Sequence, residues 1–324
     1  MQVDIFGNIK QTNLLKLANH SKQQTAPSIP YQGNKQAIVG RLVYSFPKCK
    51  HFLDACCGGG SVGYSMLAYG RAEKVTLNDI NKPLIELHKS LNDGTHDINF
   101  EFPKWYSREE FFMALERIKN GNYTPADVAA KYCFSFSNGG SCYAFNAELE
   151  KYKGLMHKVI CGETWNERRF AMRTFIQYLA KNGLKGADKH EGELQQLQKL
   201  QQLQQLQRLQ QLQQLQQLQQ LEFMSKDIYE IDYTPYDCVY FDIPYNSGTG
   251  RDKKRNYGVT FDWVKFWDFF MSLPNLAFAS EYNAPDFVPQ IVEVKKRVNM
   301  SSTNKSLVAK EKLFCNKKDY EITY

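Results

Sequence analysis

The chain has 324 residues, of which 43% are apolar and 14% aromatic, so most of it can bury a core in one large α/β domain and a smaller module. Its net charge of +7 permits a phosphate-rich partner without requiring one, because many enzymes carry as much. No apolar run approaches the roughly 20 residues that a membrane-spanning helix needs. We therefore expect a soluble protein.

The eight cysteines lack the paired CxxC spacing of a zinc site, and we expect no signal peptide in front of them. Scattered cysteines in a chain without a secretion signal are usually reduced thiols. We expect a cytoplasmic protein that holds no metal, and we interpret its cysteines as small core residues rather than nucleophiles.

The first 28 residues are polar and rich in Gln and Asn near their end, which indicates a weakly ordered lead-in (1–28). From residue 29 the pattern is that of repeated strand–helix units, which predict a doubly wound, mostly parallel α/β sheet. Strands are expected at 51–55 and 74–77, and helices at 61–69 and from Pro83 through Leu91.

Residues 100–193 depart from this pattern because they are richer in aromatic and basic residues, with helical periodicity at 111–118 and 166–179. We expect a largely helical insert there. The α/β pattern then returns, with strands expected at 237–241, 276–279, 291–294, 312–315 and 320–324. The predicted α/β domain therefore consists of residues 29–99 and 225–324.

Residues 194–221 form a low-complexity repeat in which Leu recurs every third residue, ten times, separated mostly by Gln-Gln. A period of three differs from the helical period, so the leucine stripe would rotate by about 60° per repeat around a helix. This argues against a regular two-stranded coiled coil. We expect an insertion in a tolerant surface loop that forms a loose helix, with an oligomerisation element as the alternative.

The first chemical motif is an acidic, glycine-rich turn between a strand and a helix, running from Asp54 through Gly58 and Gly60. Glycines let the backbone approach a ligand closely, and a helix N-terminus offers free N–H groups. Asp79 ends the next strand, where a carboxylate accepts hydrogen bonds from ribose hydroxyls in α/β nucleotide sites. These residues predict a nucleotide cofactor without separating a dinucleotide from S-adenosylmethionine.

The second motif, Asp242-Ile243-Pro244-Tyr245, follows a buried strand. A carboxylate and a backbone carbonyl at the end of that strand can accept both N–H groups of an exocyclic amine, while Tyr245 supplies a flat surface for stacking a base. A base must leave the duplex to reach such a site. The motif therefore indicates amine chemistry on a nucleobase.

In this order the motifs resemble the Dam-type (α-group) N6-adenine-specific DNA methyltransferases, whose chains run from cofactor loop to target-recognition insert to Asp-Pro-Pro-Tyr. The family's initial Trp/Tyr-x-Gly-x-Lys is matched by Tyr31, Gly33 and Lys35. Its acidic loop is matched by Asp54, Gly58 and Gly60, although Ala55 and Cys56 replace Pro and Phe. Its later motifs are matched by Asn78-Asp79-Ile80-Asn81 and by Ser280-Glu281-Tyr282-Asn283.

The resemblance implies the S-adenosylmethionine-dependent methyltransferase fold and a set of residue roles. The expected cofactor-binding residues are Tyr31, Gly33, Lys35, Asp54, Gly58, Gly60, Asp79 and Ile80. Asp242 would accept the N6–H of a flipped adenine and Tyr245 would stack on its ring. Ile243 departs from the family's usual Pro, but its carbonyl remains available as an acceptor.

The insert is the expected target-recognition element for double-stranded DNA. The stretch from Lys151 to Lys185 contains eight Lys or Arg residues and only two Glu residues. Basic side chains neutralise phosphates. Residues 246–257 are predicted to form a loop over the target. The expected DNA-binding residues are Asn138, Lys151, Lys153, Arg168, Arg169, Arg173, Lys253 and Lys254.

The sequence leaves alternatives open. The same acceptors suit N4-cytosine or RNA adenine methylation, and Ile243 with the repeat suits a catalytically weak DNA-binding relative. A nicotinamide oxidoreductase fits less well, because the glycine-rich loop lacks the full GxGxxG. The resemblance also allows a cognate restriction endonuclease as a partner, and we expect a monomer or weak dimer.

Overall fold

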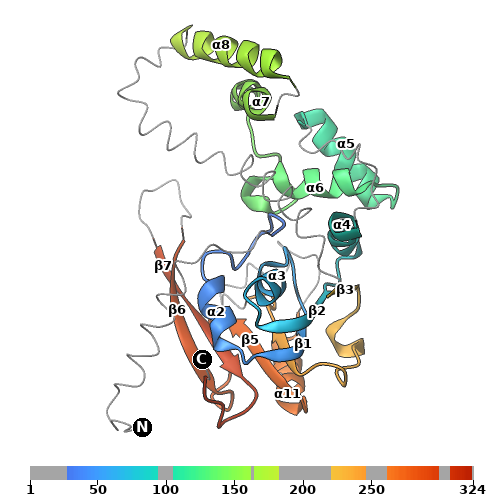
Figure 1. The fold of residues 1–324 in the computed structure, drawn as a ribbon, viewed down its shortest axis with the longest axis vertical. Coiled ribbons are helices and arrows are strands. Elements are labelled where there is room, and N and C mark those ends of the chain that lie inside the picture. The colour runs from blue at the N-terminus through green and yellow to red at the C-terminus, as the bar shows by residue number, and fades with distance from the viewer. Residues whose placement is uncertain are drawn as a thin grey trace. The chain divides into compact units, whose positions relative to one another are not determined.

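The computed structural model describes residues 28–93, 105–161, 164–181, 220–245, 261–298 and 307–322. The chain divides into two compact units. Unit 1 consists of Met1–Ser28, Gly33–Ile85 and Leu218–Tyr324, and unit 2 of Ile29–Gln32 and Glu86–Gln217. Figure 1 shows the elements of both units.

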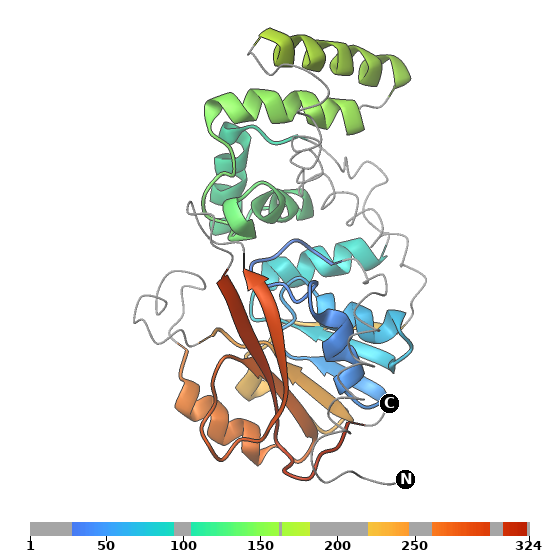
Figure 2. The same ribbon diagram turned by 90° about the vertical axis from the view of Figure 1, so that its left-hand side faces the viewer.

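Among the described residues of unit 1, seven strands form one sheet in the order β3-β2-β1-β4-β5-β7-β6. Strands β1 to β5 pair in parallel, whereas β7 runs antiparallel to both β5 and β6. The long β6–β7 pair is drawn in orange to red in Figure 2. The strands are β1 (Cys49–Asp54), β2 (Ala72–Asn78), β3 (Leu221–Met224), β4 (Cys238–Phe241), β5 (Leu276–Glu281), β6 (Gln290–Val298) and β7 (Leu307–Cys315).

Helices cover both faces of this sheet, because alternate side chains of a strand point to opposite faces. On one face Tyr240 and Phe278 pack against Phe46, which follows α2 (Val39–Ser45). On the other face Phe241 packs against Phe266 of α11 (Trp263–Ser272). This arrangement confirms the predicted doubly wound, mostly parallel α/β sheet.

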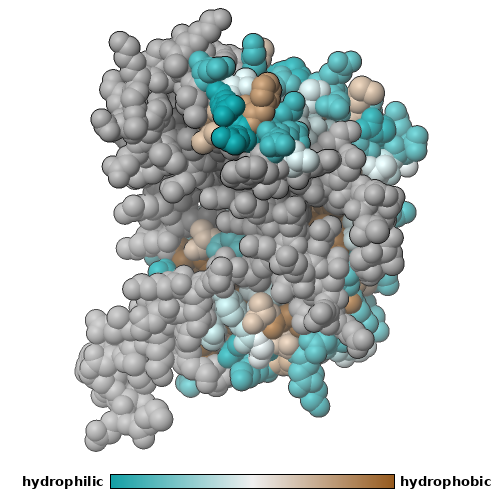
Figure 3. Space-filling model, turned by 45° about the horizontal axis from the view of Figure 1, so that its top comes forward, coloured by the Kyte–Doolittle hydropathy of each residue, from teal (hydrophilic) through white to brown (hydrophobic). Residues whose placement is uncertain are grey.

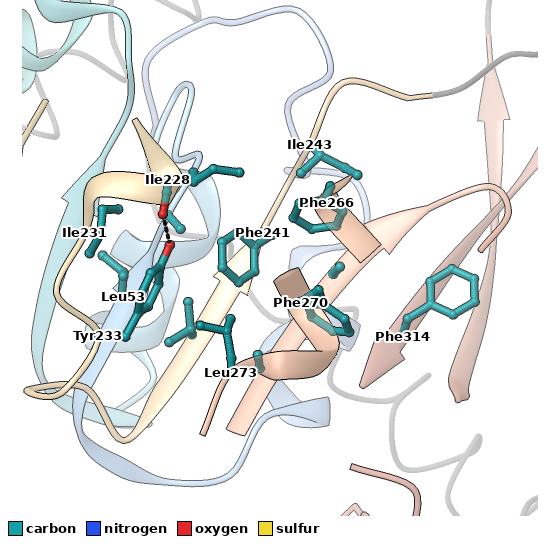
Figure 4. Packing of buried hydrophobic residues seen from close by; sticks show 14 of the residues in the cluster. Leu53, Ile228, Ile231, Tyr233, Phe241, Ile243, Phe266, Phe270, Leu273 and Phe314 are labelled. Atoms are coloured by element: carbon teal, nitrogen blue, oxygen red, sulfur yellow. Dashed lines mark hydrogen bonds between the residues drawn. The ribbon is translucent and has the colours of Figure 1, made fainter. Parts of the chain in front are cut away.

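The core on the α11 face is a continuous apolar cluster that draws residues from β1, β4, β5 and β7 (Figure 4). Its members Phe241, Phe266 and Phe270 are fully buried. Tyr233 closes one end of the cluster, where its hydroxyl donates to the carbonyl of Ile228 at 2.6 Å. This packing fixes the direction in which β4 leaves the sheet, and therefore the position of the residues that follow it.

Helix α3 (Ser61–Ala68) follows the glycine-rich turn and contacts β1 and β2. Helix α4 (Lys82–Asp93) begins in unit 1 and ends in unit 2. Short 3-10 helices lie at Ile228–Glu230 and Phe136–Asn138.

The described residues of unit 2 are mainly helical, and two of its helices contain the predicted helical segments 111–118 and 166–179. Ser107 and Thr124 begin its first two helices, each with a capping box in which side chain and backbone satisfy one another. On the face shown in Figure 3, small apolar groups lie between mainly hydrophilic residues. The helices are α5 (Arg108–Lys119), α6 (Pro125–Cys133), α7 (Ala147–Cys161) and α8 (Trp165–Lys181).

Two parts of the sequence-based assignment differ from the structure. The described residues of the predicted strand 320–324, which are 320–322, do not form a strand. Instead, the ring of Tyr320 packs on Phe278, and its hydroxyl donates to the carbonyl of Ser45 at 2.9 Å. Strand β3 was not predicted, and it starts at Leu221, the last residue of the repeat. The expectations for residues 1–27 and for the repeat before Gln220 lie outside the described residues.

Candidate active site

The candidate site lies where β1 and β4 end. These strands are parallel neighbours with Asp54 opposite Tyr240, so the residues that follow them emerge side by side at one edge of the sheet. Asp54 is the last residue of β1, and Asp242 comes directly after the last residue of β4. Ligands of open α/β sheets bind at this carboxyl edge, and the two predicted motifs meet there.

The turn after β1 adopts a conformation that requires glycine. Gly58 and Gly60 have φ of 48° and 77°, in the left-handed region that side chains rarely adopt. The backbone N–H of Gly58 donates to Asp79 at 3.0 Å, and that of Asn81 donates to the same carboxylate at 2.9 Å. Burial raises the pKa of Asp79, although these two hydrogen bonds oppose the rise. Asp79 thus holds the glycine-rich turn beside the end of β2.

Asp54 is the buried carboxyl of the turn, with 1% of its surface exposed. Its Oδ2 accepts the N–H of Gly63 in α3 at 2.9 Å. Within the part of the chain that the structure describes, its Oδ1 is buried and has no hydrogen-bond partner. Burial raises the pKa of Asp54 to about 8, against the hydrogen bond from Gly63, and the charges of Asp242 and Asp79 raise it further. A buried acceptor without a partner is costly, and a ligand donor would satisfy it.

Lys35 of the Tyr-x-Gly-x-Lys motif contacts Asp242 of the Asp-Ile-Pro-Tyr motif. Its Nζ lies 2.6 Å from each carboxylate oxygen of Asp242 and donates to the carbonyl of Gly33 at 3.1 Å. A second carboxylate, Glu311 of β7, lies 3.4 Å from the same Nζ. Burial lowers the pKa of Lys35, but the two carboxylates outweigh burial and raise it above its ordinary value. Lys35 is therefore a permanent buried cation of the site.

Tyr245 is fixed at its ring and at its hydroxyl. The hydroxyl donates to Glu311 at 2.7 Å, and the ammonium of Lys35 lies 4.8 Å from the ring centre. The ring of Tyr282, which follows β5, packs edge-on at 4.7 Å between centroids. Burial raises the pKa of Tyr245 well above its ordinary value, so the phenol stays protonated.

Ile243 and Pro244 fix the chain between the two functional side chains. The side chain of Ile243 is 2% exposed and belongs to the apolar cluster under α11 (Figure 4). The carbonyl of Pro244 accepts from the indole N–H of Trp263 at 2.8 Å. An aliphatic residue at 243 thus anchors the loop to the core.

The predicted cofactor residues are divided between the two compact units. Gly33, Lys35, Asp54, Gly58, Gly60 and Asp79 belong to unit 1, whereas Tyr31 belongs to unit 2 and packs on Tyr132 at 5.1 Å. Ile80 is 63% exposed beside Asp79. A large apolar side chain so exposed next to a half-buried carboxylate is available to a ligand.

The predicted DNA-binding residues that the structure describes belong to unit 2. Arg169 and Arg173 are exposed on the side of α8 opposite to the buried Ala171 and Phe175, since residues two apart point in nearly opposite directions on a helix. Lys151 is exposed on α7, and burial lowers the pKa of the partly buried Lys153.

Asn138 has a positive φ of 57° in a turn closed by the bridge between Ser135 and Tyr143. Arg168 lies in α8. Lys253 and Lys254, together with the rest of the predicted loop 246–257, lie outside the described residues.

Glu311 is a site residue that the sequence analysis did not predict. It lies between Lys310 and Lys312, a context typical of an exposed strand, yet only 3% of its surface is exposed. No local pattern could have found it, because its partners Lys35 and Tyr245 come from segments far away in the sequence. Ser61 was also missed: its hydroxyl accepts the backbone N–H of Lys35 at 3.3 Å.

The described residues contain no helix long and apolar enough to cross a membrane. They also contain no group of three or more His, Cys, Asp or Glu side chains that could hold a metal ion. Burial raises the pKa of the Cys56 and Cys57 thiols well above the ordinary value, so neither is an activated nucleophile.

A comparison with protein families identifies the family of this chain. The model of the D12 class N6 adenine-specific DNA methyltransferases matches residues 31–264, more than half of the chain. The match runs from the Tyr31 motif past the Asp242 motif and confirms the resemblance inferred from them. The chain therefore belongs to the D12 class N6 adenine-specific DNA methyltransferase family and is a DNA adenine methyltransferase.

Proposed function

We propose that the chain methylates the N6 amine of an adenine flipped out of double-stranded DNA, at a specific site, with S-adenosylmethionine as the donor. The observation that carries this proposal is the juxtaposition of Asp242 and Tyr245 with the glycine-rich turn after β1, at one edge of the sheet. A base inside a duplex is out of reach of such a site, so the target adenine has to leave the stack.

The proposed substrate contacts come from three neighbouring residues. Asp242 accepts one N6–H, and the carbonyl of Ile243 accepts the other. Tyr245, held by its hydroxyl on Glu311, stacks on the adenine ring. With both N–H groups engaged, the nitrogen lone pair is free to attack.

The residues of the turn fit the proposed cofactor. Gly58 and Gly60 keep side chains away from the turn, Asp79 offers a carboxylate at the position where ribose hydroxyls bind in related folds, and Ile80 offers an exposed apolar surface. Asp54 adds an acceptor that no described residue satisfies. When bound, S-adenosylmethionine supplies a methyl group on a positively charged sulfur. From their shared motif we also assign cofactor-binding roles to Gly33, Lys35 and Tyr31.

The protein's contribution is positioning and charge. The amine nitrogen forms its new bond as the sulfur–methyl bond breaks, so positive charge develops on N6 until one of its protons leaves. Asp242 stabilises that charge from hydrogen-bond distance. No covalent enzyme intermediate is needed, which agrees with cysteines whose pKa values are raised rather than lowered.

We further propose that unit 2 recognises the target. Its described surface carries Lys151, Arg169 and Arg173 in exposed positions, where they can neutralise phosphates. Under this proposal the catalytic domain comprises residues 29–99 and 225–324 together with β3, and the part of unit 2 that recognises the target is residues 100–193.

The test is transfer of labelled methyl from S-adenosylmethionine to unmethylated double-stranded DNA, followed by nucleoside analysis. The wild-type protein should form N6-methyladenine, whereas Asp242→Ala should form none and still bind the cofactor. Asp268→Ala, which removes an exposed carboxylate from α11, is the matched control and should keep full activity. Label on cytosine, label only on RNA, or turnover by Asp242→Ala would contradict the proposal.

A further inference from the structure

Glu311 is a buried acid that none of the sequence motifs includes. It lies on β7, the antiparallel strand inserted between β5 and β6, and 3% of its surface is exposed. A carboxylate in such a position is retained only when it is paired and hydrogen-bonded. Its partners are the ammonium of Lys35 at 3.4 Å and the hydroxyl of Tyr245 at 2.7 Å. Both partners belong to motifs of the proposed site.

The group formed by Lys35, Asp242 and Glu311 contains two carboxylates but only one ammonium. One buried ammonium, Lys35, faces two carboxylates, Asp242 and Glu311. Asp242 is the nearer, with both oxygens 2.6 Å from Nζ. An adenine amine that arrives at Asp242 must therefore share these oxygens with Lys35.

The second carboxylate resolves this competition. If Asp242 were the sole counter-ion of Lys35, turning one of its oxygens to the substrate would weaken the compensation of a buried positive charge, which is expensive in a low-dielectric interior. Glu311 is close enough to compensate Lys35 while Asp242 accepts the amine. The same carboxylate holds Tyr245 by its hydroxyl, so that one side chain aligns both proposed substrate contacts.

We propose that Glu311 is a positioning residue for methyl transfer: it holds Lys35 and the Tyr245 hydroxyl so that Asp242 is free to accept the adenine amine. This inference rests on the proposed function of Asp242 and Tyr245. It assigns no contact with substrate to Glu311 itself. A merely structural role, in which Glu311 only stabilises β7, is the competing explanation.

The decisive variant is Glu311→Gln, which keeps an acceptor for the Tyr245 hydroxyl and removes the charge. The maximal rate of N6-methyladenine formation should fall about 10- to 100-fold, which is less than the roughly 100- to 1,000-fold cost of losing one direct transition-state contact, because Glu311 acts through Lys35. The dissociation constant of the cofactor should change by less than about threefold, since the proposed cofactor contacts remain. Glu293→Gln, on the neighbouring strand β6, is the control and should behave as wild type.

A double-mutant cycle separates positioning from stability. In a Lys35→Met background, Glu311→Gln should lower the rate no further, because the cation through which Glu311 acts is gone. In a Tyr245→Phe background, which removes only the hydroxyl, Glu311→Gln should still lower the rate. This second background keeps the proposal testable if Lys35→Met fails to fold.

Three results would overturn the inference: a wild-type rate for Glu311→Gln, an equal loss in the wild-type and Lys35→Met backgrounds, or a parallel loss of cofactor affinity. The wild-type protein is assayed first. If it forms no N6-methyladenine, the proposed function fails and the role of Glu311 fails with it. If the wild type is active and Glu311→Gln is unimpaired, only the role of Glu311 is refuted.

Discussion

The proposed role of Asp54 in cofactor binding predicts that cofactor affinity depends on pH. Its carboxyl is 1% exposed, and burial raises its pKa to about 8. At neutral pH the free protein therefore holds Asp54 mostly protonated. If Oδ1, for which no described residue is a hydrogen-bond partner, accepts a hydrogen bond from the cofactor, as we propose, binding favours the ionised form and releases a proton.

The expected magnitude follows from linkage. With a pKa of about 8, Asp54 is about 1% ionised at pH 6 and about half ionised at pH 8. The dissociation constant should therefore fall roughly 50-fold between these two pH values and level off above them.

The assay is calorimetric titration with S-adenosylhomocysteine from pH 6 to 9, with proton release measured in buffers of different ionisation enthalpy. Asp54→Asn is the control, since it keeps the shape of the side chain and cannot titrate. The affinity of Asp54→Asn should lack the pH dependence that Asp54 causes in the wild type. Comparing the two profiles also cancels any titration of the ligand. A flat wild-type profile would refute the reasoning, and an inverted profile would show that Asp54 binds as a neutral acid that donates its proton.

The same shift predicts how stability depends on pH. Because the folded-state pKa lies above the ordinary value of 3.8, the stabilising contribution of Asp54 is complete below about pH 4 and is lost as the pH rises to about 8. Within that window unfolding free energy should fall by about 1.4 kcal/mol per pH unit more in the wild type than in Asp54→Asn. Denaturant titrations at several pH values measure this difference.

Two further predictions concern Ile243 and the basic face of α8. Ile243→Ala should lower the free energy of unfolding by about 2–4 kcal/mol, because a side chain that is 2% exposed leaves a cavity. Methyl transfer per folded molecule should persist, because the backbone carbonyl at position 243 remains. Denaturant titration and the methyl-transfer assay measure the two effects, and an unchanged stability would contradict the packing argument. Arg169→Ala and Arg173→Ala should each weaken binding to DNA of any sequence and reduce the slope of log affinity against log salt concentration by about one. The control Met172→Ala, on the same helix, should change neither quantity, and unchanged slopes in the two Arg variants would show that α8 does not contact DNA.

The sequence alone predicted the elements that carry local patterns. The strands ending at Asp54 and Phe241 are short apolar runs bounded by turn residues, and both are found within two residues of their predicted limits. The helix through Phe175 follows from its periodicity. In each of these cases the residues that define the element lie next to one another in the chain.

What could not be predicted depends on contacts between distant segments. Glu311 has a surface-like sequence context and is buried only because β7 pairs with β5 beside Lys35 and Tyr245. Strand β3 begins at the end of a Gln-rich repeat and is recruited by pairing with β2, not by its own composition. Tyr31 stands two residues before Gly33 in its motif, yet the two belong to different compact units.

The replacement of Pro by Ile at position 243 is best understood from the roles of backbone and side chain. The proposed acceptor there is a carbonyl, which every residue has, so chemistry does not select the side chain. Proline would stiffen the turn through its ring, whereas Ile243 fixes the turn by inserting its side chain into the cluster with Phe241 and Phe266. The carbonyl of Pro244, held by Trp263 at 2.8 Å, constrains the next residue from the same helix. Two contacts with α11 thus restrain the chain between Asp242 and Tyr245, and this restraint makes an active enzyme, rather than a vestigial binding protein, the expected outcome of the methyl-transfer assay.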